Sequence, residues 1–166
     1  MWRLASPGLA PLSAVFNVVQ TAVLAANKLT LVVPLFLLNG TGTSASFSAE
    51  QLQALSYLAI KAHGHGFGIG LIFFGFACLV RGYLIYRSGY LPKLLGLLLV
   101  LAGLGYLVNS FALILAPALA AQLSPAVLVP AFVGELALSL WLIVKGVDRA
   151  QWGRHGAPQR SADQAA

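Results

Sequence analysis

The chain has 166 residues, of which 59% are hydrophobic and only 8% are charged, with a formal net charge of +6. Ordinary soluble domains carry about 25% charged residues, so the composition excludes a soluble domain and favours an integral membrane protein. The basic residues stand at the ends of apolar runs, which is the pattern that orients membrane helices, and so we expect no nucleic-acid partner.

A bilayer crossing takes about 20 apolar residues, which leaves room for about four spans. The first runs from 12 to 38, longer than one crossing needs, and Pro34 should tilt or kink it near its end. The loop NGTGTSAS follows. Ser48-Ala49-Glu50-Gln51 then reads as a capping box, so a helix should begin well before the second span at 66–86.

The basic segment RSGYLPK, 87–93, predicts a tight turn, because glycine and proline stop one helix and let the next begin. The third span covers 94–116. An uncharged link, PALAAQLSP, leads to the fourth at 126–144. We therefore expect an all-α transmembrane domain over 1–146, with four helices in a bundle, and a disordered polar tail over 147–166.

Loop charge predicts the orientation of these spans, because segments rich in Lys and Arg stay in the cytoplasm. Eight of the ten basic residues fall on one side of the four-span arrangement: Arg3, Arg81, Arg87, Lys93, Lys145, Arg149, Arg154 and Arg160. Both termini should therefore be cytoplasmic, in a multi-pass protein of the cell membrane, the inner membrane of a bacterium.

Ionisable groups within a span are costly and usually face the bundle interior. Glu135 lies about 13 Å into the fourth span, and Lys28 lies about 15 Å from the outer end of the first. Because these depths match, we expect Lys28 and Glu135 to pair or to share a polar pocket. A stripe of about 120° on the first span supports this cluster; it contains Ser13, Asn17, Gln20, Thr21, Asn27 and Lys28. Asn109, Ser110 and Ser139 could complete the pocket. The alternatives are that the stripe is interhelical packing or that it faces a partner chain.

The segment HGHGFGIG raises the question of a metal or proton site. His63 and His65 lie about 200° apart on a helix, so they cannot both bind one metal unless the glycines unwind it. Gly66 and Gly70 form a GxxxG pair, typical of close helix packing. We therefore place both histidines at the outer membrane interface, and expect no metal or cofactor.

No Ser-His-Asp set, phosphate loop or carboxylate pair can be assembled from the chain. Its four acidic residues are Glu50, Glu135, Asp148 and Asp163, and only Glu135 is expected at depth. Cys78 is the single cysteine, which excludes an internal disulfide. We therefore expect no catalytic residues and no enzymatic activity.

Two long segments carry a family resemblance: RGYLIYRSGYLPKLLGLLLVLAGLGYLVNSF at 81–111 and VPAFVGELALSLWLIVKG at 129–146. Together with FNVVQTAVLAANKLTL and HGHGFGIGLIFFGF, they resemble the prokaryotic membrane-protein family catalogued as domain of unknown function 4386. The resemblance covers 16–146 and implies the same topology without an activity. Members of that family usually carry two further spans before this region, so we expect either a shortened member or a misplaced start codon.

Two functions lead at this point, and a membrane-embedded enzyme or haem protein is a third. The first is a non-enzymatic membrane protein that acts by helix association, with itself or with another membrane protein, through the glycine faces and the polar stripe. The alternative is a small permease or ion-coupled carrier, with Glu135 as the coupling carboxylate and Lys28, His65 and Asn109 nearby.

Overall fold

The computed structural model describes residues 8–39, 46–89, 91–123 and 125–147, and these ranges contain helices and no strand. In chain order the elements are α1 (Leu9–Asn27), α2 (Leu29–Leu38), α3 (Ala49–Ser88), α4 (Lys93–Leu115), α5 (Pro117–Leu123), a 3₁₀ turn (Ala126–Leu128) and α6 (Val129–Val144). Four segments are long and apolar enough to cross a membrane: Leu9–Leu38, Ala49–Ser88, Lys93–Leu115 and Ala126–Val144. The all-helical class is thereby confirmed. The expected tail lies outside the described residues from 148 onward.

The predicted capping box starts α3. The Ser48 hydroxyl accepts a hydrogen bond from the Gln51 backbone N–H at 3.2 Å, and the Ser48 N–H donates to the Gln51 side chain at 2.9 Å. From there the helix runs for 40 residues without a break, through the HGHGFGIG segment. The helix expected to begin at the capping box and the second span are therefore one continuous helix, about 60 Å long at 1.5 Å per residue.

The turn from α3 to α4 contains the glycine and the proline that were predicted to separate the two helices. Gly89 ends α3 with a φ of 69°, the left-handed conformation that glycine adopts without steric cost. Pro92 lies directly before the first residue of α4 and cannot continue a preceding helix. The chain thus reverses, and α4 returns along α3.

The first apolar segment is interrupted at Lys28, before the proline. α1 ends at Asn27 and α2 begins at Leu29, while Pro34 lies within α2. The Leu31 N–H donates to the Lys28 carbonyl, three residues back, instead of to Asn27. The interruption therefore leaves the Asn27 carbonyl without a backbone donor.

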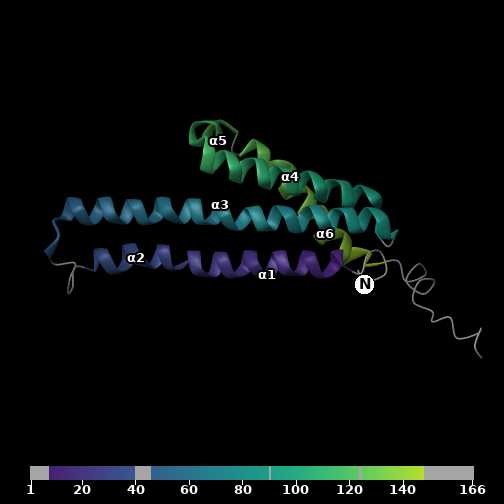
Figure 1. The fold of residues 1–166 in the computed structure, drawn as a ribbon, viewed down its shortest axis with the longest axis horizontal. Coiled ribbons are helices and arrows are strands. Elements are labelled where there is room, and N and C mark those ends of the chain that lie inside the picture. The colour runs from purple at the N-terminus through teal and green to yellow at the C-terminus, as the bar shows by residue number, and fades with distance from the viewer. Residues whose placement is uncertain (1–7, 40–45, 90, 124, 148–166) are drawn as a thin grey trace, which may run out of the picture.

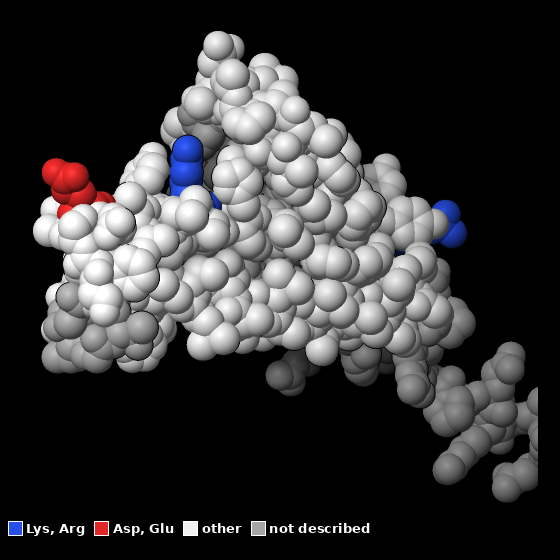
Figure 2. Space-filling model, turned by 60° about the vertical axis from the view of Figure 1, so that its left-hand side comes forward, with Lys and Arg blue, Asp and Glu red and all other residues white. Residues whose placement is uncertain are grey.

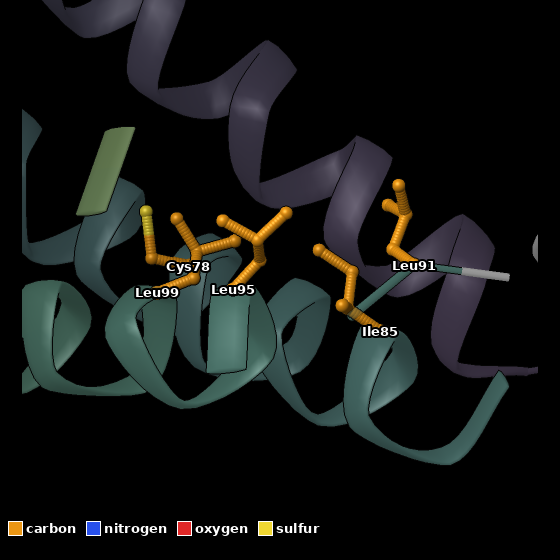
Figure 3. Packing of buried hydrophobic residues seen from close by; sticks show 5 residues of the cluster. All are labelled: Cys78, Ile85, Leu91, Leu95 and Leu99. Atoms are coloured by element: carbon orange, nitrogen blue, oxygen red, sulfur yellow. The ribbon is translucent and has the colours of Figure 1, made fainter. Parts of the chain in front are cut away.

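Helix α3 is the centre of the arrangement. Its largest interface is with α4, α1 and α2 pack along another side of it, and α6 packs on α4 (Figure 1). The buried apolar cluster lies where α3, the turn and α4 meet, and its side chains point to the same side (Figure 3): Cys78, Ile85, Leu91, Leu95 and Leu99. Ala137, Leu138 and Trp141 of α6 pack against this cluster. Among the described residues α1 packs on α3 and has no comparable interface with α4 or α6.

The N-terminal part of α3 extends beyond α4. Gly68 faces the side chain of Leu113, which is close to the last residue of α4, so among the described residues the preceding turns of α3 lie beside α2 and the end of α1 (Figure 1). The α2 side of this pair is apolar and open, with Leu29 and Phe36 each 69% exposed. Of the described residues on the face drawn in Figure 2, nearly all are uncharged.

Candidate functional site

Glu135 lies between α4 and α6, where it is half-buried. Its carboxylate accepts a hydrogen bond from the Tyr106 hydroxyl at 2.6 Å. The Tyr106 ring in turn packs against Phe74 of α3, with 5.3 Å between ring centroids. Glu135 is thus held by a neighbour on the adjacent helix, at the level of Phe74.

The structure does not bring Lys28 to Glu135, and the predicted pair is wrong for a reason of register. The residue before Lys28, Asn27, packs on α3 at Gly66, whereas Tyr106 packs at Phe74. Eight residues of helix separate these levels, about 12 Å. α1 and α6 also lie against different helices, α3 and α4 respectively. Lys28 is exposed instead, and forms no ion pair within the described part of the chain.

A second polar cluster forms at the interruption between α1 and α2. The Asn27 side chain donates to the His63 carbonyl at 2.9 Å. The Asn27 carbonyl, which the interruption deprives of a backbone donor, accepts from the Thr30 hydroxyl at 2.6 Å and faces His63 Nδ1 at 3.2 Å. A carbonyl only accepts, so Nδ1 is the donor in this last contact. Asn27, Thr30 and His63 therefore complete the backbone hydrogen bonding at the break.

The two histidines have different environments, as their angular separation predicts. His63 is partly buried against α1 and α2, whereas His65 is exposed, with Nδ1 at 3.0 Å from the Lys61 carbonyl in its own helix. The described residues contain no group of three His, Cys, Asp or Glu side chains placed to hold a metal ion. His65 does not join Glu135.

The two GxxxG glycines of α3 pack against α1 of the same chain. Gly66 lies against the Asn27 side chain, and a Cβ on Gly70 would come within 2.6 Å of Leu24. Both therefore let α1 approach α3. A Cβ on Gly64 would have no neighbour within 4 Å, and Gly68 faces Leu113 of α4, so neither of these glycines takes part in the contact with α1.

Sequence reasoning missed a close backbone approach, which joins α3 to α4. A Cβ on Gly82 would lie 2.7 Å from the Gly96 carbonyl oxygen, and one on Gly103 would lie 2.7 Å from the Gly75 oxygen. In each helix the two glycines are seven residues apart, and this matched spacing is the signal that could have identified them.

The polar stripe of α1 divides into a buried part and an open part. The Ser13 hydroxyl lies 3.4 Å from the Ala77 carbonyl, and Asn27 contacts α3 as described. Thr21 bonds to the Asn17 carbonyl in its own helix. The side-chain amides of Asn17, Gln20 and Asn109 have no hydrogen-bond partner among the described residues. Ser110, predicted to complete the pocket, is fully buried with its hydroxyl unpartnered.

A small cavity of about 140 Å³ opens between α1 and α3. It is lined by Ala10, Ser13, Ala14, Asn17, Arg81 and Leu84. The Arg81 side chain is partly buried there and has no acceptor or carboxylate partner within the described ranges. The described site residues thus present one carboxylate between α4 and α6, and a partly buried imidazole and an unpaired guanidinium at different heights along the α1 side of α3.

The chain matches the family described as domain of unknown function (DUF4386) over residues 1–146, which confirms the resemblance seen in the sequence. An uncharacterised protein from Archaeoglobus fulgidus is 36% identical over 78 residues. That match covers 47% of this chain and 44% of the relative, so the chain spans less than half of the relative's length. No solved structure matches the chain.

Proposed function

We propose that this chain, which belongs to the DUF4386 family, is a multi-pass protein of the cell membrane that has no enzymatic activity and acts by helix association. Its partner is a second copy or another membrane protein, and the contact surface is the outer face of α1 and α2. The four apolar segments support insertion in a bilayer. Arg81, Arg87, Lys93 and Lys145 gather toward the end of the helices where α3 ends and α4 begins, which supports cytoplasmic termini.

One observation carries the proposal: the Gln20 side-chain amide has no hydrogen-bond partner among the described residues, on a span of which only 11% is buried within the chain. A polar side chain that faces hydrocarbon without a partner is costly, and such groups usually hydrogen-bond across helices. A helix from outside the described chain would satisfy this amide.

The surface differs from the one that the glycine pattern suggests. Gly66 and Gly70 already contact α1, and Gly75 and Gly82 already contact α4. The proposed surface is the outer face of α1, continued by exposed apolar side chains of α2 beyond the end of α4: Leu29, Leu35, Phe36 and Leu38.

The test is site-specific photo-crosslinking in native membranes, with a photoreactive residue at Val18, which is 68% exposed on α1. Two copies with different tags are co-expressed, and adducts are separated by size. We expect a protein adduct from Val18 and only lipid adducts from a matched probe at Leu104, which is exposed on α4. Lipid adducts alone from both positions would overturn the proposal.

A carrier function is the second candidate, because Glu135 is an ionisable group within a span and such residues often mark ion pathways. Lys28 and His65 lie apart from Glu135, so the carboxylate would act with Tyr106 in place of the expected cluster. Proton or solute flux into vesicles tests this function. Flux that is unchanged in Glu135→Gln would remove it.

A further inference from the structure

We propose that the cavity between α1 and α3 is an anion site in which Arg81 binds the phosphate of an anionic phospholipid headgroup. Among the described residues that line the cavity, Arg81 alone is charged, and no described carboxylate neutralises it. An unpaired guanidinium in partly apolar surroundings is costly, and phosphate is the group that it binds best, through two parallel N–H···O bonds.

The cavity has the lining that such a headgroup requires. Asn17 offers a side-chain amide with no partner in the described chain, next to the Ser13 hydroxyl. Ala10, Ala14 and Leu84 supply apolar contact for the carbons beside the phosphate. At about 140 Å³ the cavity is well below the 300–1,000 Å³ usual for whole ligands, which favours a small anionic group over a complete solute.

The position of the cavity favours a lipid as the source of the phosphate. Arg81 lies seven residues before the end of α3, about 10 Å along the helix, so its long side chain can reach the headgroup level. The same end of the helices carries Arg87, Lys93 and Lys145, which attract anionic lipid in a cytoplasmic leaflet.

The site is tested with the full chain in a mild non-ionic detergent at constant ionic strength. The probes are short-chain phosphatidylglycerol, short-chain phosphatidylcholine and inorganic phosphate, and the readouts are the thermal midpoint and the number of lipids retained in native mass spectrometry. The variants are Arg81→Gln and a matched control, Arg87→Gln, whose side chain stacks over Tyr83 at 5.9 Å outside the cavity.

We expect phosphatidylglycerol to stabilise the wild type and Arg87→Gln, and to bind Arg81→Gln about tenfold more weakly, with one fewer retained lipid. If inorganic phosphate has a matching effect, the cavity binds anions as proposed, and its ligand is free phosphate and not a lipid headgroup. Equal responses of Arg81→Gln and Arg87→Gln to every probe would overturn the proposal. If Arg81→Gln does not fold, Asn17→Leu removes a cavity amide and should weaken the same response; an unchanged response would count equally against the site.

Discussion

The Tyr106 hydroxyl donates a hydrogen bond to Glu135 across 2.6 Å and so joins α4 to α6 through the most deeply placed described carboxylate. Tyr106→Phe removes the donor and leaves the carboxylate unpartnered, so we expect a loss of about 1–3 kcal/mol in the free energy of unfolding. Unfolding in mild detergent measures it. Tyr83→Phe is the control, because Tyr83 is 45% exposed and only its ring has a described contact. Equal effects of the two variants would contradict a structural role for the bond.

Lys28 and Glu135 should behave as independent residues. They lie at levels of α3 about 12 Å apart and share no partner, so the effects of Lys28→Met and Glu135→Gln on unfolding should add within about 0.5 kcal/mol. A double-mutant cycle in detergent checks this. Recovery of stability in the double variant would show that the two residues interact after all.

The contact of α3 with α4 depends on glycines, which have no side chain, where the two helices come closest. Gly82→Ala places a Cβ 2.7 Å from a backbone oxygen of α4. A backbone atom cannot move aside as a side chain can, so we expect the free energy of unfolding to fall by about 1–3 kcal/mol. Gly64→Ala is the matched control in the same helix, because nothing lies within 4 Å of its Cβ position. That substitution should be neutral or should stabilise the protein by up to about 1 kcal/mol. Similar losses in both variants would indicate a general intolerance of α3 to alanine.

Gly66 and Asn27 should show strong coupling. A Cβ on Gly66 would overlap the Asn27 amide, so Gly66→Ala must displace that side chain and break its hydrogen bond to His63. In an Asn27→Ala background the obstacle is absent, and the same substitution should cost less by about 1 kcal/mol or more. Thermal unfolding of the four proteins measures the coupling. Additive effects of the two substitutions would argue that alanine at position 66 destabilises the protein for a reason other than its contact with Asn27.

Ser110 should be replaceable by alanine. Its hydroxyl is fully buried and unpartnered among the described residues, so Ser110→Ala removes an unsatisfied polar group at little cost in packing. We expect a change between zero and about 1 kcal/mol of stabilisation, measured by unfolding in mild detergent. Marked destabilisation would contradict this expectation and show that the hydroxyl has a partner in the assembled protein.

Local signals in the sequence were sufficient to place several boundaries. The capping box at Ser48 and Gln51 starts α3, and Gly89 and Pro92 separate α3 from α4, because each acts through backbone geometry within a few residues. The angular separation of His63 and His65 was also predictable, since helix geometry alone decides it. The interruption at Lys28 was not, because the visible helix breaker, Pro34, lies six residues further along the chain.

By itself the sequence determined the helical class, the four apolar segments and their family, because these follow from composition, periodicity and local turn chemistry. Only the tertiary structure decided which polar groups meet. Axial register sets Asn27 against His63 and Tyr106 beside Glu135, and it leaves Lys28 about 12 Å from the level at which it was expected to pair. Periodicity predicts the face on which a residue lies, but the height at which two helices pack is set by contacts such as Gly82 against Gly96, which join residues of different helices.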